Sequence, residues 1–187
     1  MSALIAAAFA LQQFFEARQW RFCIIGGIAL LRWGGPRFTD DVDATLLTGF
    51  GREDEFARQI LSAGYEARVP DAIAFAQKRR VLLCEAPNGT PIDISFGGLP
   101  FEELVIERSS LFEFEPGCWL RTCSAEDLIV QKLFAFRPQD LLDVETVHIR
   151  QRGNLDWAYI ETQLAPLAEL KEQPEIMAEF FKLRRRS

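Results

Sequence analysis

Apolar residues recur at different spacings along the chain, and the spacing predicts strands mainly in the first part and helices in the last. A helical stripe covers residues 3–19, and a short apolar run over Arg21–Ile25 is typical of a buried strand. Two glycines, at positions 26 and 27, interrupt that run. After them we expect a short apolar helix over Ile28–Trp33 and then a strand over Asp41–Leu47.

Turn residues mark two hairpins further along the chain. Apolar runs over Val81–Ala86 and Pro91–Phe96 flank an Asn-Gly pair, which is a strong hairpin signal. A Pro-Gly pair at positions 116 and 117 gives a weaker signal of the same kind. One helix is predicted before the first hairpin, over Glu53–Ala63, and one after it, over Phe101–Glu107.

From Ser124 onward the patterns are helical. Ser124 is suited to cap a helix, with Asp127 three residues later as in a capping box, and Pro138 is suited to open the next helix. Two further helices are predicted, over Trp157–Leu170 and Glu175–Leu183. The chain therefore predicts an α/β or α+β fold, with a core in residues 1–122 that includes the N-terminal helix and a helical C-terminal subdomain in residues 123–187.

Composition narrows the classes of function. The chain has 187 residues, the length of about one domain with a small appendage. Its net charge of −6 argues against broad nonspecific binding of nucleic acid, but it does not exclude a local basic groove. Four scattered cysteines and a single histidine offer no zinc-ligand spacing and fit free thiols in a reducing compartment. The apolar N-terminal stretch is too short to span a bilayer and poorly built as a signal peptide. We expect a soluble, cytoplasmic protein.

Two carboxylates in the sequence Asp41-Val42-Asp43 are the first candidates for chemistry. On a strand, residues i and i+2 point to the same face, which would place Asp41 and Asp43 roughly 6.6 Å apart at the backbone. Two like charges so placed repel unless a cation lies between them, and Mg²⁺ prefers such oxygen ligands. Asp93, between two isoleucines of a later predicted strand, would join the pair if the two strands are neighbours. Three carboxylates could then hold two metal ions for phosphoryl or nucleotidyl transfer.

Each of these features taken alone also has a plain explanation. An Asp-x-Asp near a turn is more often a cap or a solvated edge, a lone Asp in a strand is more often exposed, and Gly-Gly commonly forms a turn. The order of the features favours a site instead. A strand, two glycines, a short helix, Arg37-x-Thr39 and Asp-x-Asp follow one another, and an Asp-bearing strand comes later.

This order resembles the signature of the nucleotidyltransferase superfamily with the DNA-polymerase-β-like core, in which Gly-Gly or Gly-Ser precedes Asp-x-Asp or Asp-x-Glu. Here 13 residues separate Gly27 from Asp41. The string Gly-Gly-x-Ala … Arg-x-Thr-x-Asp-x-Asp is similar to the small bacterial branch that contains the AbiEii-type toxins of toxin–antitoxin systems, over about residues 20–150. The resemblance implies a mixed β-sheet flanked by helices, a nucleoside triphosphate (NTP) as substrate, and Mg²⁺, two ions in all, bound by the carboxylates.

The nucleotide contacts are predicted on five residues. Gly26 and Gly27 lack side chains, so the triphosphate could approach backbone N–H groups at the start of the short helix. Arg37 and Lys132 would neutralise phosphate charge, and Thr39 would bind the phosphates or brace the loop. Asp93, besides binding metal, could receive the proton of the acceptor as a general base.

Lys132 lies within the apolar stripe of its predicted helix, where it either snorkels at the edge of the stripe or binds an anion. The resemblance favours a nucleotide phosphate, because a Lys followed by Arg-x-x-Asp-x-x-Asp recurs in the AbiEii-like branch. Here Arg137, Asp140 and Asp143 fill those places. Whether the two aspartates are structural or functional stays open, since Asp140 also suits the first turn of a helix.

Two classes of function follow, with a third as the plainest alternative. The first is an Mg²⁺-dependent nucleotidyltransferase that moves a nucleoside monophosphate (NMP) from an NTP to a hydroxyl of RNA or tRNA, of a protein or of a small molecule, with an antitoxin as a further partner. The second is a non-catalytic module on the same fold that binds a nucleotide or a partner. In the third, the acidic residues are only surface decoration of an interaction protein.

Overall fold

The computed structural model describes residues 1–186, which form two compact units. The first unit consists of Met1–Ile28 and Phe38–Cys123, and the second of Ala29–Arg37 and the chain from Ser124 onward. The segment Ala29–Arg37 thus belongs with the C-terminal helices and not with the sequence around it. Each unit is described by itself below.

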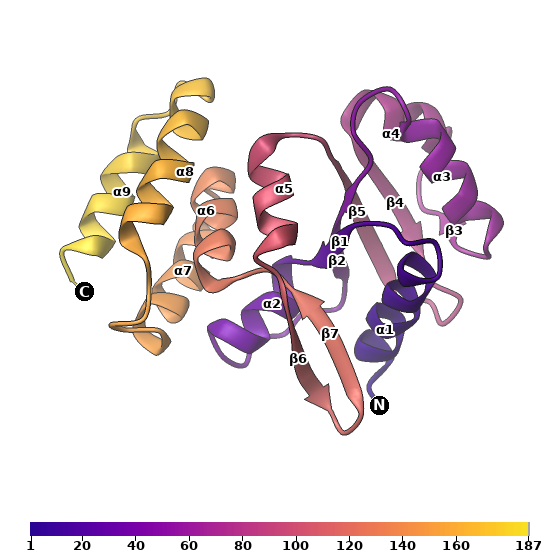
Figure 1. Cartoon of the computed structure of the whole chain (residues 1–187), viewed down its shortest axis with the longest axis horizontal. Coiled ribbons are helices and arrows are strands. Elements are labelled where there is room, and N and C mark those ends of the chain that lie inside the picture. The colour runs from indigo at the N-terminus through magenta and orange to yellow at the C-terminus, as the bar shows by residue number, and fades with distance from the viewer. Residues whose placement is uncertain (187) are drawn as a thin grey trace. The chain divides into compact units, whose positions relative to one another are not determined.

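The first unit is built on one seven-stranded sheet (Figure 1). Its strands are β1 (Phe22–Ile24), β2 (Val42–Leu47), β3 (Glu66–Ala67), β4 (Val81–Glu85), β5 (Pro91–Gly97), β6 (Ser110–Glu115) and β7 (Cys118–Thr122). The strand order is β3-β4-β5-β2-β1-β7-β6. The pairs β2–β5 and β1–β7 are parallel and the other neighbours are antiparallel, so the sheet is mixed, as predicted.

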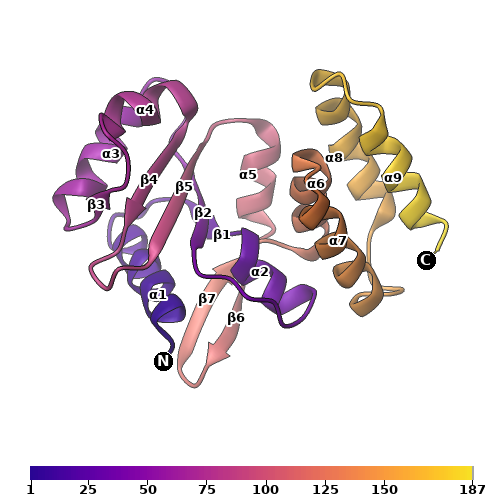
Figure 2. The same ribbon diagram turned by 180° about the vertical axis from the view of Figure 1, so that it is seen from behind.

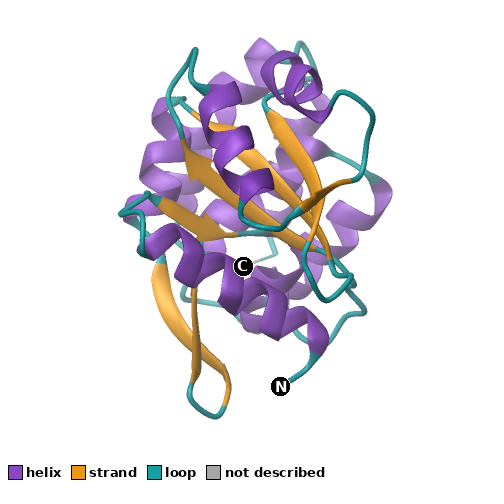
Figure 3. Ribbon diagram, turned by 90° about the vertical axis from the view of Figure 1, so that its right-hand side faces the viewer, coloured by secondary structure: helices purple, strands orange, loops and turns teal. Residues whose placement is uncertain are grey.

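Helices accompany these strands along the chain, as Figure 3 shows by colour. They are α1 (Ala3–Glu16), α2 (Gly26–Trp33), α3 (Glu53–Ser62), α4 (Ala72–Arg79) and α5 (Pro100–Glu107), and α2 ends in the second unit. Helix α1 is capped by Ser2, whose side chain accepts a hydrogen bond from the N–H of Ile5. It buries an apolar stripe at helical spacing that includes Leu11 and Phe15.

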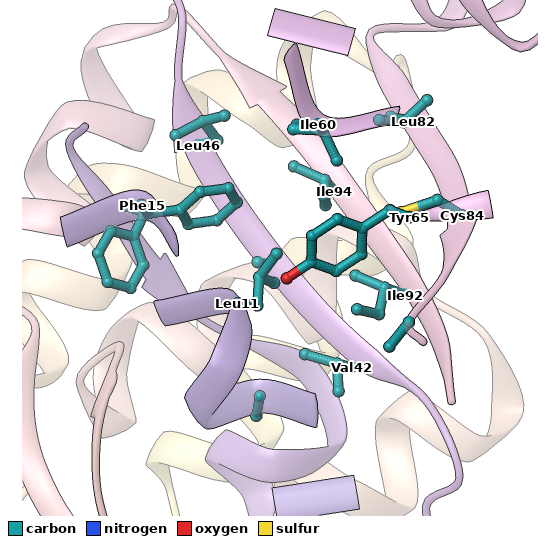
Figure 4. Close-up of a cluster of buried hydrophobic side chains, with 14 of the residues drawn as sticks. Leu11, Phe15, Val42, Leu46, Ile60, Tyr65, Leu82, Cys84, Ile92 and Ile94 are labelled. Atoms are coloured by element: carbon teal, nitrogen blue, oxygen red, sulfur yellow. The ribbon is translucent and has the colours of Figure 1, made fainter. Parts of the chain in front are cut away.

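Alternation along the central strands gives the sheet one apolar and one mixed face. In β5 the side chains of Ile92, Ile94 and Phe96 are buried, whereas Asp93 and Ser95 between them are partly exposed. The apolar face forms the core of the unit together with side chains from the helices and neighbouring strands, and Figure 4 shows part of it, with labelled side chains of Leu11, Phe15, Val42, Leu46, Ile60, Tyr65, Leu82, Cys84, Ile92 and Ile94. Burial of this face fixes the strand register, so the polar residues are fixed on the opposite face.

The second unit contains four C-terminal helices, which lie side by side in Figure 2. They are α6 (Ala125–Ala135), α7 (Pro138–Arg150), α8 (Trp157–Leu170) and α9 (Glu175–Arg184). Ser124 caps α6 as predicted, accepting a hydrogen bond of 3.1 Å from the N–H of Asp127. Pro138 is the first residue of α7, also as predicted.

Most predicted elements are present within a few residues of their expected bounds, and the mixed α/β fold class is confirmed. The two glycines differ from expectation, because they begin α2 instead of preceding it. Strand β3 and helix α4 were not predicted. In the part of the chain that the structure describes, no helix is long and apolar enough to cross a membrane.

Candidate active site

The predicted carboxylates lie on two neighbouring parallel strands of the first unit. Strands β2 and β5 pair in a register that places Asp43 directly opposite Asp93. Paired residues in a sheet point to the same face, and neighbouring strands lie about 4.8 Å apart. Asp41 directly precedes β2, two residues before Asp43. The condition set by the sequence, that the two Asp-bearing strands be neighbours, is therefore met.

Asp93 is half-buried and forms an ion pair with Arg68. The distance from Arg68 Nη2 to Asp93 Oδ1 is 2.6 Å, and the Asp93 side chain is 33% exposed. Burial raises the pKa of the Asp93 carboxyl, and the nearby charge of Asp41 adds to the rise, whereas Arg68 opposes it. A carboxylate with a raised pKa is a stronger base than an ordinary one, which suits the predicted role in proton transfer.

Arg68 is the site residue that sequence reasoning missed. It follows β3, and its backbone N–H donates to the carbonyl oxygen of Leu83 at 3.1 Å. Leu83 lies opposite Asp93 in the antiparallel pair of β4 and β5. The sequence around Arg68 has neither a periodic pattern nor a recognised motif, so only the sheet register brings it to Asp93.

The two glycines of the motif are required by close contacts. Gly26 has a φ of +58°, and a Cβ atom there would overlap the carboxylate of Asp43. A Cβ atom at Gly27 would overlap the side chain of Thr39. The start of α2 therefore lies against the Asp-x-Asp segment, and only residues without side chains allow this approach.

Thr39 braces the loop that leads into β2. Its hydroxyl donates a hydrogen bond of 3.1 Å to Oδ1 of Asp41. Of the two roles predicted for Thr39, this hydrogen bond concerns the bracing of the loop, and binding of phosphates stays a prediction. Five predicted residues of the motif, together with Asp93, thus come together in the first unit: Gly26, Gly27, Thr39, Asp41, Asp43 and Asp93.

Arg37 and Lys132 belong to the second unit, where both bind the carboxylate of Asp143. Arg37 Nη1 lies 2.5 Å from Asp143 Oδ2, and Lys132 Nζ lies 2.7 Å from the same oxygen. Lys132 also binds Asp140 Oδ1 at 3.0 Å, and Arg137 Nε binds Asp140 Oδ2 at 2.6 Å. The side chain of Lys132 is only 10% exposed, so it does not snorkel into water.

This network bears on the question of whether Asp140 and Asp143 have a structural or a functional role. Asp140 and Asp143 are both buried, and their charges are compensated by Arg37, Lys132 and Arg137. They therefore hold α6, α7 and the segment before Phe38 together in the second unit. The guanidinium of Arg37 remains about one third exposed, at 36%, and stays available to an anion.

The carboxylates are oxygen ligands of the kind that Mg²⁺ prefers, and phosphates of the substrate would supply the remaining ligands. Among residues 1–186, no group of three or more His, Cys, Asp or Glu side chains is placed so that it could hold a metal ion. Mg²⁺ characteristically binds one or two carboxylates plus substrate phosphates and keeps several waters, so a complete protein cage is not required. The register of Asp43 and Asp93, with Asp41 alongside, provides hard oxygen donors on one face of the sheet.

The family profile described as "Nucleotidyl transferase AbiEii toxin, Type IV TA system" matches residues 7–153 of the chain. The chain belongs to this family. As an AbiEii-family protein it is a nucleotidyltransferase, and the branch suggested by the Gly-Gly and Asp-x-Asp motifs is confirmed. The matched segment includes every predicted site residue, from Gly26 to Lys132.

Solved structures share the fold of this AbiEii-family protein. An antigenic nucleotidyltransferase-like protein from Paracoccidioides brasiliensis aligns with a TM-score of 0.55 at 15% identity, covering 94% of this chain and 91% of that one. The lincomycin-bound lincosamide antibiotic adenylyltransferase LnuA aligns with a TM-score of 0.51 at 13% identity, covering 76% of this chain and 94% of that one. The antibiotic-resistance factor ANT(2'')-Ia aligns with a TM-score of 0.52 at 18% identity, covering 90% of this chain and 89% of that one. The comparison with curated proteins gives no match.

Proposed function

We propose that the protein transfers an NMP from an NTP to an acceptor hydroxyl, with Mg²⁺ bound by Asp41, Asp43 and Asp93. The register that places Asp43 opposite Asp93 on parallel strands carries this proposal. It puts carboxylates from two separate motifs on one face of the sheet, where their charges call for a cation. Two metal ions bound there would stabilise the charge that develops on the transferred phosphoryl group and on the leaving pyrophosphate.

The residues around the carboxylates would bind and orient the triphosphate. Gly26 and Gly27 bring the first backbone N–H groups of α2 close to Asp43, and a helix N-terminus favours a phosphate. Thr39 keeps Asp41 in place through its hydrogen bond. Arg37 would neutralise phosphate charge with the exposed part of its guanidinium. Lys132 stays a proposed phosphate contact, which would require it to exchange one of its carboxylate partners.

Asp93 would serve as the general base. Its carboxylate accepts the proton of the acceptor hydroxyl, and the acceptor oxygen forms a bond to the α-phosphorus. The bond between the α-phosphorus and the bridging oxygen breaks, and pyrophosphate leaves with that electron pair. The burial that raises the pKa of Asp93 increases its affinity for the proton.

The acceptor and the biological role are the broader part of the proposal. RNA or tRNA, a protein hydroxyl and a small molecule each present a suitable nucleophile. The family description supports a toxin with an antitoxin partner, and the antibiotic-modifying adenylyltransferases among the structural neighbours illustrate the small-molecule class. The four buried free cysteines support a reducing location such as the cytoplasm.

The test is transfer of label from α-³²P-labelled NTPs to the components of a cell lysate. We expect the wild-type protein with Mg²⁺ to label one class of molecule and to release pyrophosphate. Replacing two of the three proposed metal ligands in the Asp41→Asn/Asp43→Asn variant should abolish labelling, because the neutral amides no longer attract the cation. Nuclease and protease digestion of the product then identify the acceptor as RNA, protein or a small molecule.

Asp40→Asn is the matched control, since Asp40 is an exposed neighbour in the same segment. It should label the lysate as the wild type does. Retained labelling in the double variant, with its fold intact by circular dichroism, would reject the site. Specific binding of NTP with no labelled product and no pyrophosphate would instead favour the non-catalytic module.

A further inference from the structure

Arg68 lies in one register row with two of the proposed metal ligands. Antiparallel pairing matches Ala67 to Cys84, so Arg68 falls opposite Leu83, to which its N–H donates at 3.1 Å. Leu83 is opposite Asp93, and Asp93 is opposite Asp43. Residues in such a row share a face of the sheet, so the Arg68 side chain reaches across Leu83 to the carboxylate of Asp93.

The ion pair differs from an ordinary surface salt bridge in two respects. Both side chains are only partly exposed, by 28% for Arg68 and 33% for Asp93, although Arg68 as a whole residue is exposed. The backbone of Arg68 is also fixed by its hydrogen bond to β4, so the guanidinium does not have to be ordered from a free loop. The contact engages Asp93 Oδ1 at 2.6 Å, a short charge-assisted hydrogen bond.

We propose that Arg68 is a positioning residue for Asp93. By holding Oδ1 of the Asp93 carboxylate, it would keep Oδ2 turned toward Asp43 in the same register row. This inference rests on the function proposed above. A partner that binds one oxygen of a ligating carboxylate fixes its rotation, and loss of such a partner typically weakens metal binding or activity by about 10–100-fold. Arg68 would act on the cation only through Asp93.

A competing arrangement has the opposite consequence. If the guanidinium merely stands in for a cation that later displaces it, removal of Arg68 would free Asp93 and strengthen metal binding. The direction of the change in metal affinity therefore separates the two arrangements, and it can be measured without knowing the acceptor.

The experiment measures Mn²⁺ affinity of the full-length protein, from the electron paramagnetic resonance signal of free Mn²⁺. Arg68→Met removes the donors and keeps an unbranched apolar side chain in place of the arginine stem, and Arg68→Lys keeps a single charged donor group. Arg58→Gln is the control, because Arg58 is 67% exposed and only reaches Asp54 at 4.0 Å. Thermal unfolding without metal checks that each variant is folded, and Arg68→Gln replaces Arg68→Met if the latter is not.

We expect Arg68→Met to bind Mn²⁺ at least 10-fold more weakly than the wild type, Arg68→Lys to recover most of the loss, and Arg58→Gln to be unchanged. Unchanged or tighter binding in Arg68→Met, or a loss that lysine does not recover, would overturn the inference. Wild-type binding no tighter than that of Asp41→Asn/Asp43→Asn would overturn the proposed metal site itself, together with the role of Arg68. If the wild type and Arg68→Met both bind the metal normally, only the role of Arg68 is overturned and the proposed metal site stands.

Discussion

At the scale of single residues, the glycines carry the most specific information. Gly26 and Gly27 are expected from the sequence to let phosphates approach the backbone. The structure adds a second requirement, because Gly26 leaves room for the carboxylate of Asp43 and Gly27 for the side chain of Thr39. The motif thus specifies packing within the site as well as access to it.

Gly26→Ala tests this requirement. The positive φ alone should cost about 1–2 kcal/mol, and the new methyl group must also displace the Asp43 carboxylate. We expect the free energy of unfolding, measured with urea, to fall by more than that amount, and label transfer to fall at least about 10-fold, the lower bound for disturbing a ligand's position.

Gly117→Ala is the matched control for backbone strain. Gly117 also has a positive φ, of +76°, but a Cβ atom there would have no neighbour within 4 Å. This variant should lose stability through strain alone and keep its transfer activity. Equal effects of the two substitutions on stability and on transfer would contradict the account of Gly26.

Arg68 shows where residue-level prediction from the sequence ends. The three aspartates, two glycines and Thr39 stand in short recognisable motifs, so their convergence could be expected. Arg68 reaches Asp93 through the pairing of β3 with β4, a contact that depends on the folded sheet. A single arginine without a motif gives no local signal of that kind.

At the scale of elements, strong local patterns predicted the structure and weak ones did not. The hairpin between β4 and β5 forms around Gly89, whose φ of +83° explains the Asn-Gly signal. Strand β3 has two exposed residues and therefore no alternation to detect. Helix α4 has only eight residues, and its N-cap, Asp71, has a φ of +49° and makes no side-chain capping bond.

Lys132 on α6 links that helix to α7, because it binds both Asp140 and Asp143. Lys132→Met would leave the two buried carboxylates with less compensation. Breaking a buried ion pair by removing one partner costs about 3–5 kcal/mol, so we expect a loss of that size in the free energy of unfolding.

Lys182→Met provides the comparison within the same unit. Lys182 forms an exposed pair with Glu179, and its loss should change stability by about 0–1 kcal/mol. The measurement is urea denaturation followed by circular dichroism. Similar small losses in both variants would show that the Lys132 network does not hold the two helices.

At the scale of the whole molecule, the sequence divides the chain into a strand-rich part and a helical part. In the structure, one boundary between the two units lies between Cys123 and Ser124. The structure also assigns Ala29–Arg37 to the helical unit, where Arg37 binds Asp143. That assignment rests on contacts between residues more than 100 positions apart, which local patterns do not report.

The central claim is that carboxylates from two motifs bind a divalent cation on one face of the sheet. The most direct measurement is a crystal of the protein soaked with Mn²⁺ and an NTP analogue, with anomalous scattering used to locate the metal. We expect a peak bound by oxygens of Asp43 and Asp93, with Asp41 in the same cluster, at distances near the approximately 2.1 Å typical of Mg²⁺. Full nucleotide occupancy with no anomalous peak at these carboxylates, or with a peak bound elsewhere, would contradict it.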